Sequence, residues 1–287
     1  MKKFYHGSIN SNLKQLEVIS KCNENPNIKC AYITDNYAYS LFYVRDMDIN
    51  LVTAWVNKDG IVCYEEQFEN QLEIMYKNQS GYIYSCEDDN EFIKSETNGI
   101  YYSKKPIVLT EKEYISDAYS KIQQQIKSGN IEIKYYKDNS KERLNFLYEG
   151  IKLKILKNNF FENNEKLINF YKTHYEKSWN MALLENAIKN LEATLRKQDK
   201  SKFSCIECEN QHKQILNWLV ELRDYENGNV GNNLEDSAMS GYISLDEAIE
   251  HTKDVVNFAE NDKIKREHEE LLNYLQKLKM YRNSQKK

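Results

Sequence analysis

The sequence predicts an α+β protein, with a mixed domain of short strands and helices over residues 1–137 and an all-α domain over residues 138–287. Short apolar and aromatic runs alternate with turn residues in the first part, whereas apolar residues recur at helical spacing in the second. The chain has 287 residues, of which 40% are hydrophobic and 29% charged, and this suits two domains with folded cores.

Composition excludes several classes of protein. The 40 Lys and Arg against 44 Asp and Glu give a net charge of −4, so the whole chain carries no basic field that would hold nucleic acid. With nine Gly and two Pro, collagen-like, Pro-rich and Gly/Ser-linker chains are excluded. The heavy use of Lys, Asn, Ile and Tyr is typical of an AT-rich bacterial or phage genome.

The sequence also predicts a cytoplasmic protein. The start, MKKFYHGS, has no apolar segment behind its lysines, so we expect no signal peptide. No run of about 18 apolar residues occurs, so we expect no membrane span. Six cysteines, at positions 22, 30, 63, 86, 205 and 208, are too sparse for a disulfide framework. A reducing cytosol, in the cell of origin or in a host cell, fits this usage best.

Apolar runs bounded by turn residues predict the strands of the first domain, in chain order at 3–6, 30–34, 50–57, 61–64, 81–85, 100–103, 106–109 and 131–136. Lys58-Asp59-Gly60 predicts a hairpin turn between the third and fourth of these. Helical spacing predicts a helix over 36–44 with Asp35 as its N-cap, and a second over 116–127 that stops at Ser128-Gly129.

The second domain contains a repeat. The segment 211–225 (QHKQILNWLVELRDY) aligns with 267–281 (EHEELLNYLQKLKMY), so that His212 matches His268 at an offset of 56 residues. Upstream, Ala187-Ile188 aligns with Ala248-Ile249 at an offset of 61. We therefore expect two helical hairpins, at about 183–225 and 244–282, the first with about five extra residues in its connection.

Other helices of this domain are expected before the repeat, where apolar residues share one face: Leu144, Leu147, Ile151 and Ile155 in one helix, and Leu167, Phe170, Tyr171 and His174 in the next. The glycine-containing segment 226–241 is expected to be the hinge between the hairpins. Ser244 and Glu247 have the spacing of a capping box that opens the second hairpin.

The candidate chemistry lies in the first domain. His6-Gly7-Ser8 directly follows an apolar strand, which brings a histidine side chain and an exposed backbone to one place. Glycine permits close approach of a ligand to the main chain. The alternative is an ordinary turn in which His6 is satisfied locally.

Two tyrosines follow at a suggestive spacing. Tyr32 lies in the expected strand CAYIT, and Tyr43 lies at the end of the expected helix 36–44. A strand-to-helix turn can place two such rings on either side of a flat ligand. Since the chain has 22 tyrosines, the spacing is also compatible with chance.

Taken together, YHGS, AYIT and the second tyrosine resemble the ADP-ribosyltransferase fold of the diphtheria-toxin and poly-ADP-ribose-polymerase type, with its His–Tyr–Glu signature, over residues 1–137. The resemblance implies a split β-sheet and binding of NAD. It implies that His6 bonds the nicotinamide ribose, that the Gly7 backbone holds the carboxamide, and that Tyr32 and Tyr43 enclose the nicotinamide. Ser8 occupies a position where the family often has Ser or Thr.

The family also places a Glu near the start of a late strand, where it stabilises the positive charge that develops on the ribose. Glu96, a few residues before the strand IYYS, is the first choice for this role. Glu113 is the second choice, and Glu65 and Glu66 are the third. Without such a Glu the domain is an inactive binder, or performs another chemistry.

Related folds without the Glu include an RNA 2′-phosphotransferase type. Such an enzyme requires basic residues at its site. The candidates here are few, namely Arg45 and Lys3.

Cys205, Cys208 and His212 are spaced like metal ligands, but zinc takes four ligands and the second hairpin keeps only the histidine, as His268. The three residues also share one helix face, so we interpret them as packing residues and expect no metal. The leucine and aromatic stripes are interpreted as helix–helix core, and the basic C-terminus as a solvated end. No P-loop, G-x-G-x-x-G, H-E-x-x-H or G-x-S-x-G occurs, so kinase, Rossmann, zincin and α/β-hydrolase functions have no support.

Two functional hypotheses follow. The first is an enzyme that uses NAD as substrate and moves ADP-ribose to an unknown acceptor, such as a protein, with His6 and Glu96 as catalytic residues. By analogy, it would act as a toxin, a defence factor or a counter-defence factor. The second is a non-catalytic nucleotide-binding or interaction protein whose helical repeats bind a partner or form a homo-oligomer.

Overall fold

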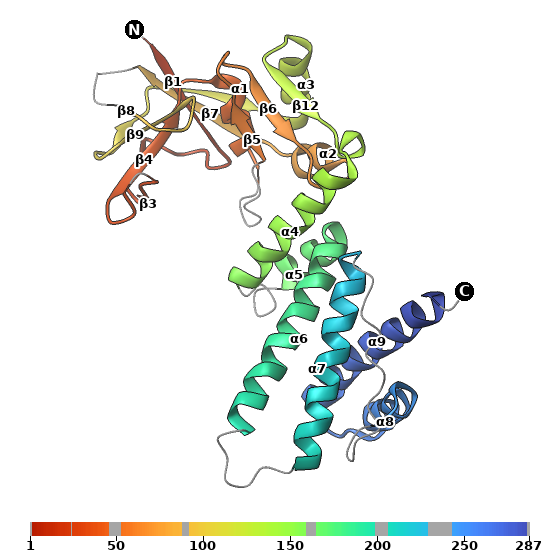
Figure 1. Cartoon of the computed structure of the whole chain (residues 1–287). Coiled ribbons are helices and arrows are strands. Elements are labelled where there is room, and N and C mark those ends of the chain that lie inside the picture. Colours follow the sequence, from red (N-terminus) through yellow and green to blue (C-terminus); the bar gives the residue numbers. More distant parts are fainter. Residues whose placement is uncertain are drawn as a thin grey trace. The chain divides into compact units, whose positions relative to one another are not determined.

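The computed structural model describes residues 2–23, 25–45, 53–87, 92–158, 165–198, 206–228 and 243–285. An antiparallel sheet region is followed by helices, which confirms the predicted α+β class (Figure 1). The chain divides into two compact units, Met1–Leu147 and Tyr148–Lys287. This division falls later than the expected one at residue 137, because helix α4 (Lys141–Lys157) begins in the first unit. Its Arg143 donates a hydrogen bond of 2.8 Å to Glu65 of that unit.

The main sheet of the first unit is antiparallel throughout. Its order is β11-β7-β1-β4-β9-β8, with β3 paired to β4. Figure 1 labels the strands from β7 to β8 of this order. The strands are β1 (Lys3–Ser8), β3 (Ser20–Lys21), β4 (Lys29–Thr34), β7 (Gly81–Glu87), β8 (Ile93–Lys94), β9 (Ile100–Ser103) and β11 (Glu111–Ile115). Phe4 of β1 and Ile33 of β4 are fully or almost fully buried in one apolar cluster, and this burial fixes which face of the central strands is inside.

The central strands β1 and β4 separate from each other. Among the described residues they pair at one position, Tyr5 with Thr34. In a continued ladder His6 would face Ile33 and Gly7 would face Tyr32. Instead, β1 stays paired along its whole length with β7, and β4 stays paired with β9. The sheet is therefore open between β1 and β4 on the side of His6 and Gly7.

Two smaller sheets complete the strands of this unit. The predicted hairpin is present, with β5 (Ala54–Val56) antiparallel to β6 (Val62–Glu65). The last strand, β12 (Ile131–Lys134), pairs parallel to β6. The short strands β2 (Gln15–Leu16) and β10 (Ile107–Val108) form a pair of their own. The expected strand over 50–57 lies partly outside the described residues.

The helices of this unit are short: α1 (Tyr37–Ser40), η1 (Leu41–Tyr43), α2 (Gln71–Tyr76), α3 (Ala118–Lys127) and η2 (Tyr136–Asp138). The expected N-cap of the first helix was wrong by one residue. Asn36, not Asp35, accepts a hydrogen bond of 2.9 Å from the Tyr39 N–H, and Asp35 pairs with Lys2 instead. Neither α2 nor the charged strand β11 was predicted from the sequence.

The second unit is helical, and in each of its two predicted hairpins the two helices contact each other. Helices α6 and α7 pack together, and so do α8 and α9. The helices after α4 are α5 (Glu165–His174), α6 (Glu176–Gln198), α7 (Ile206–Glu226), α8 (Leu245–Phe258) and α9 (Asp262–Gln285). The predicted capping box is present, because the Ser244 hydroxyl accepts from the Glu247 N–H and the Glu247 carboxylate accepts from the Ser244 N–H. The expected hinge over 226–241 lies mostly outside the described residues.

Helices α7 and α9, the two copies of the repeat, contact each other in a reciprocal way. Tyr225 and Tyr281 occupy equivalent positions, and their rings stack at 5.3 Å with an interplanar angle of 3°. Equivalent leucines from both helices, including Leu222 and Leu278, are buried in one cluster. A residue that meets its own equivalent indicates an approximate two-fold relation between the helices. The repeat therefore forms the core of this unit.

The described helices include none with the length and apolar character that a membrane crossing requires.

Candidate functional site

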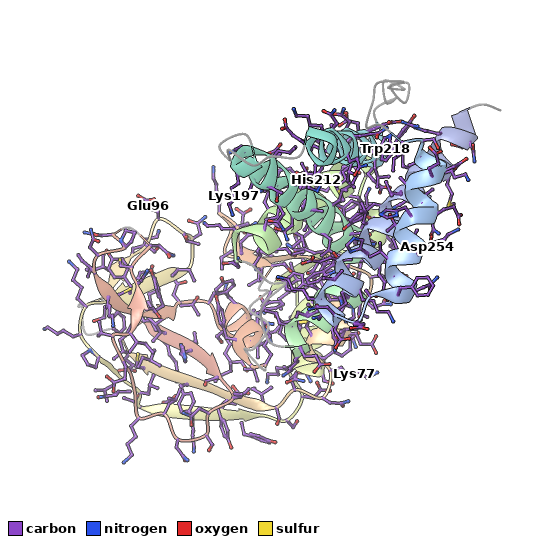
Figure 2. The ribbon with its side chains drawn as sticks, turned by 90° about the horizontal axis from the view of Figure 1, so that it is seen from below. Lys77, Glu96, Lys197, His212, Trp218 and Asp254 are labelled. Atoms are coloured by element: carbon purple, nitrogen blue, oxygen red, sulfur yellow. The ribbon has the colours of Figure 1, made fainter. Side chains whose placement is uncertain are left out.

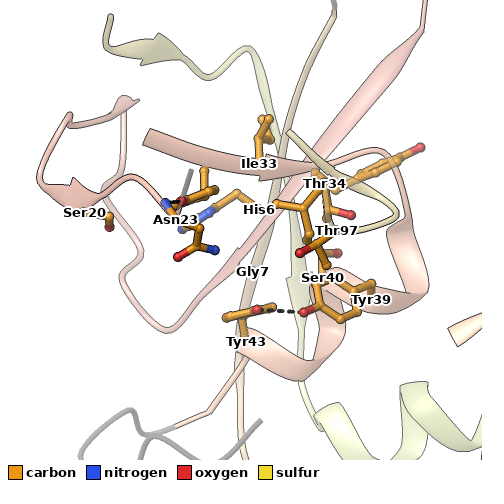
Figure 3. A pocket seen from close by; sticks show the side chains of 13 residues that line it. His6, Gly7, Ser20, Asn23, Ile33, Thr34, Tyr39, Ser40, Tyr43 and Thr97 are labelled. Atoms are coloured by element: carbon orange, nitrogen blue, oxygen red, sulfur yellow. Dashed lines mark hydrogen bonds between the residues drawn. The ribbon is translucent and has the colours of Figure 1, made fainter. Parts of the chain in front are cut away.

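A pocket of about 340 Å³ lies where β1 and β4 separate. Figure 3 shows its lining, which comes from β1, the β3–β4 hairpin, β4, the α1–η1 turn and the residues before β9. The lining residues are Tyr5, His6, Gly7, Ser20, Asn23, Tyr32, Ile33, Thr34, Tyr39, Ser40, Tyr43, Thr97 and Ile100. Four residues that the sequence singled out, His6, Gly7, Tyr32 and Tyr43, therefore lie at one place.

His6 is partly buried beside the opening of the sheet. Its ring lies beside the backbone of Tyr32, the residue that would face Gly7 if the β1–β4 ladder continued. Burial lowers the pKa of the imidazole below its ordinary value, and the interaction with the Tyr32 backbone only partly opposes this. The ring is therefore neutral at pH 7, so one ring nitrogen carries a proton and the other can accept a hydrogen bond.

Gly7 is required by the packing of its own chain. A Cβ atom at this position would lie 2.0 Å from the Ser40 carbonyl oxygen and 3.1 Å from the Tyr43 Cβ. The glycine thus lets the α1–η1 turn lie directly against β1, which brings Tyr43 to the pocket. Ser8 is not among the lining residues, and its hydroxyl accepts a hydrogen bond of 3.1 Å from the Asn10 N–H.

The two lining tyrosines predicted from the sequence, Tyr32 and Tyr43, are held by their hydroxyl groups. The Tyr32 hydroxyl accepts from the Asn23 N–H at 2.7 Å, and burial raises its pKa to about 12. The Tyr43 hydroxyl lies 3.1 Å from the Tyr39 hydroxyl, and Tyr39 is itself buried, with 7% of its surface exposed. In the view of Figure 3, Gly7 lies between the His6 and Tyr43 side chains. The rings are therefore fixed before any ligand arrives, which limits the entropy lost on binding.

The first two candidate carboxylates lie outside the described lining. Glu96 is exposed at the periphery of the first unit (Figure 2), and its neighbour Thr97 lines the pocket instead. Glu113 is exposed on β11, where it accepts a hydrogen bond of 2.9 Å from the Tyr37 hydroxyl and pairs with Lys121 at 3.1 Å. Two strands, β7 and β1, lie between β11 and β4 in the sheet, and Glu113 is not among the described lining residues.

Glu65 and Glu66 are buried at the end of β6, and both hold secondary structure together. Glu65 pairs with Arg143 and Lys134, and hydrogen bonding to the Arg143 guanidinium keeps the pKa of Glu65 below its ordinary value. Glu66 accepts hydrogen bonds from two backbone N–H groups, one of them that of Tyr136 at 3.2 Å. Neither carboxylate belongs to the pocket lining.

The described lining residues include no Asp, Glu, Lys or Arg. Of the two basic residues considered for a phosphotransferase, Arg45 is fully buried with its guanidinium 5.9 Å from the Tyr76 ring centre. Lys3 is ion-paired with Glu111. A phosphate group would therefore find no cation in the described lining, and the pocket suits a part of a ligand that carries no negative charge.

Several lining residues were missed from the sequence, namely Ser20, Asn23, Thr34, Tyr39, Ser40 and Thr97. Asn23 and Ser20 belong to the β3–β4 hairpin, and Thr97 precedes β9. Strand pairing brings these segments together over long sequence separations, and no local pattern marks them.

The possible metal ligands are only partly described, because Cys205 and the side chain of Cys208 lie outside the described residues. Within the part of the chain that is described, no group of three or more His, Cys, Asp or Glu side chains is arranged to hold a metal ion. His212 lies on α7 (Figure 2), and its equivalent His268 makes a 2.8 Å hydrogen bond between Nδ1 and the Ile264 carbonyl.

Comparisons with known proteins leave the site to be interpreted from its own geometry. No protein-family model matches the chain, and neither a curated protein nor a solved structure is significantly similar to it.

Proposed function

We propose that the first unit binds NAD in the pocket between β1 and β4 and transfers ADP-ribose to an acceptor, with release of nicotinamide. The observation that carries this proposal is the convergence of His6, Gly7, Tyr32 and Tyr43 on one open pocket. These residues were singled out by their resemblance to the ADP-ribosyltransferase signature. These four residues converge because β1 and β4 separate beyond Tyr5 and Thr34. The spacing of the four residues in the sequence does not by itself require that separation.

The character of the pocket supports a flat ligand group without negative charge. Its volume, about 340 Å³, lies in the range of small-molecule sites. Four tyrosines of the lining supply aromatic surface, and the neutral His6 and the hydroxyl groups supply hydrogen bonds without charge. The nicotinamide-ribose end of NAD fits this chemistry, because the nicotinamide is a flat cationic ring that tyrosine faces attract and the ribose carries neutral hydroxyl groups. The diphosphate of NAD would have to lie outside the described lining.

In the proposed reaction the bond between ribose C1′ and the nicotinamide nitrogen breaks. Nicotinamide leaves with the electron pair and becomes neutral, and the ribose carries an oxocarbenium-like charge. An acceptor nucleophile then bonds to C1′ and gives up its proton. Glu96 is the proposed carboxylate, because it adjoins Thr97 of the pocket and precedes β9.

A second candidate function is nucleotide or partner binding without catalysis. It is favoured by the lack of a carboxylate among the described lining residues. The helical unit offers a further pocket of about 260 Å³ between α6, α7 and α9, lined in part by Asn180, Glu270 and Tyr274, where a partner group would bind.

Calorimetry with NAD and an assay of nicotinamide release, both on the intact chain, distinguish the two candidates. An enzyme binds NAD and releases nicotinamide, and His6→Ala and Glu96→Gln each lower the rate about 100-fold. The matched controls are His251→Ala and Glu69→Gln, which replace exposed residues outside the pocket and leave the rate unchanged.

Binding of NAD without release, under every acceptor tried, favours the non-catalytic candidate. Loss of activity in His6→Ala but not in Glu96→Gln removes the role of Glu96. If calorimetry detects no NAD binding at millimolar concentration, the proposal is wrong.

A further inference from the structure

The polar groups of the pocket fall into two sets. Several are already engaged within the chain: the hydroxyls of Tyr32, Tyr39, Tyr43, Thr34 and Ser40 all take part in hydrogen bonds. Others make no side-chain hydrogen bond to any described residue, and these include the side-chain amide of Asn23, the Ser20 and Thr97 hydroxyls and a ring nitrogen of His6. Asn23, Ser20 and Thr97 are exposed, so water bonds these groups until a ligand displaces it.

His6 determines what kind of ligand group can lie beside it. Since burial keeps the ring neutral, one ring nitrogen has a lone pair and no proton. That nitrogen can accept a hydrogen bond but cannot donate one. A ligand atom that carries a proton, as a hydroxyl group does, can donate to it.

Asn23 adds a complementary group from the β3–β4 hairpin. Its backbone N–H donates to the Tyr32 hydroxyl at 2.7 Å, which fixes the residue at the pocket wall. In Figure 3 the side chains of Asn23 and His6 lie on the same side of the pocket. The amide offers both a donor and an acceptor, and each hydroxyl of a sugar is both as well.

We infer that Asn23 is a specificity-determining residue that binds one hydroxyl of the ribose diol while the neighbouring hydroxyl donates to His6. The inference rests on the proposed binding of NAD, and places the nicotinamide ribose at these two residues. It goes beyond the signature residues, because Asn23 is supplied by the hairpin. The site then selects ribose over a sugar that lacks one of the two hydroxyls.

The test measures the Kd of NAD and of two NAD analogues that lack the 2′- or the 3′-hydroxyl of the nicotinamide ribose. The unchanged chain is compared with Asn23→Ala. The matched control is Asn27→Ala, which replaces an exposed asparagine of the same hairpin that does not line the pocket. The backbone N–H of Asn27 donates to the Asn25 side chain, but the side-chain amide of Asn27 makes no hydrogen bond to a described residue.

We expect Asn23→Ala to raise the Kd of NAD about tenfold, as loss of one or two neutral hydrogen bonds does, and Asn27→Ala to leave it within twofold. In the unchanged chain each analogue binds about tenfold more weakly than NAD. In Asn23→Ala one analogue binds as well as NAD does, because the hydroxyl it lacks no longer has a partner. A residue that only supports the hairpin would weaken all three ligands equally.

Equal weakening of all three ligands in Asn23→Ala, or an unchanged Kd for NAD, overturns the role of Asn23 and leaves the proposed NAD binding intact. If the unchanged chain binds neither NAD nor the analogues, both the proposed function and this inference are wrong.

Discussion

At the scale of single residues, two glycines lead to opposite expectations for the same substitution. A Cβ at Gly7 would lie 2.0 Å from the Ser40 carbonyl oxygen, which is backbone and cannot rotate away. Gly7→Ala must therefore push β1 and the α1–η1 turn apart, and we expect a loss of about 2 kcal/mol in the free energy of unfolding. Gly150 lies exposed within α4 with no atom within 4 Å of an added Cβ. Gly150→Ala should stabilise its helix by up to about 1 kcal/mol.

Urea unfolding followed by circular dichroism measures both substitutions. Because Gly7 also positions Tyr43, Gly7→Ala should weaken NAD binding at a temperature where the variant is still folded. A Gly7→Ala protein as stable as the unchanged chain would contradict the close packing of β1 on the turn.

His6 predicts a pH dependence of stability. Burial lowers the pKa of its ring, so between that lowered pKa and about 6.5 the unfolded chain binds a proton that the folded chain does not. In this window the free energy of unfolding rises with pH, and acidification destabilises the folded state. We expect the advantage of the unchanged chain over His6→Asn in urea unfolding to shrink from pH 7.5 to pH 5. An advantage that grows on acidification would mean that the ring is charged in the folded protein.

The sequence predicted only some of the pocket residues, for a physical reason. His6, Gly7, Tyr32 and Tyr43 lie in short segments whose spacing is local, so a family resemblance could identify them. Asn23 and Thr97 reach the pocket through strand pairing across many residues, and nothing in their own neighbourhoods marks them. Glu96 illustrates the same limit. Its position shortly before β9 suggested that it reaches the site, but the neighbouring Thr97 lines the pocket instead.

At the scale of elements, equivalent residues of the repeat form the ion pairs between α7 and α9 as well as the core between them. Glu221 and Lys277 are equivalent positions, and so are Glu226 and Arg282. Arg282 pairs with Glu221 at 2.8 Å, and Lys277 pairs with Glu226 at 2.8 Å. The residues equivalent to the Glu221–Arg282 pair, Lys277 and Glu226, therefore also pair with each other, as in an isologous interface. The periodicity of the sequence predicted the hairpins and their cores, whereas this reciprocity needed the packing of α7 on α9.

The two ion pairs differ in burial, which gives a prediction with its own control. The Glu221 side chain is 1% exposed and that of Arg282 is 16% exposed, so Arg282→Met leaves a buried carboxylate without its cation. We expect this substitution to cost about 3 kcal/mol in the free energy of unfolding. Lys277→Met at the equivalent position should cost less than about 1 kcal/mol, because Lys277 is 45% exposed and Glu226 also accepts from the Tyr281 hydroxyl.

Urea unfolding of the two variants and of the double variant Glu221→Leu/Arg282→Met decides this. The double variant should recover most of the loss, because it removes both charges together. Equal losses in Arg282→Met and Lys277→Met would contradict the difference in burial.

At the scale of the whole molecule, each unit has its own core, and the pocket and the repeat lie in different units. The pocket is lined by residues of Met1–Leu147, and the repeat forms a core within Tyr148–Lys287. The helical unit contributes none of the described pocket residues, so the proposed NAD chemistry requires only the first unit. The second unit is then available for recognition of an acceptor or for assembly.

Hydrogen exchange on the intact chain tests this division. If NAD binds as proposed, amides of β1, the β3–β4 hairpin and the turn before β9 should exchange more slowly when it is added. Ligand binding stabilises the segments that it contacts against local opening. Amides of α7 and α9 should not change, since no described residue of these helices lines the pocket.

The control is the His6→Ala chain, in which NAD should slow exchange nowhere if protection arises from the pocket. Protection of α7 or α9 in the unchanged chain that disappears in His6→Ala would show that the units are energetically coupled. Protection of the same helices that persists in His6→Ala would instead place a nucleotide site in the helical unit. Either result would contradict the assignment of NAD binding to the first unit acting alone, because the proposed chemistry would then depend on the repeat.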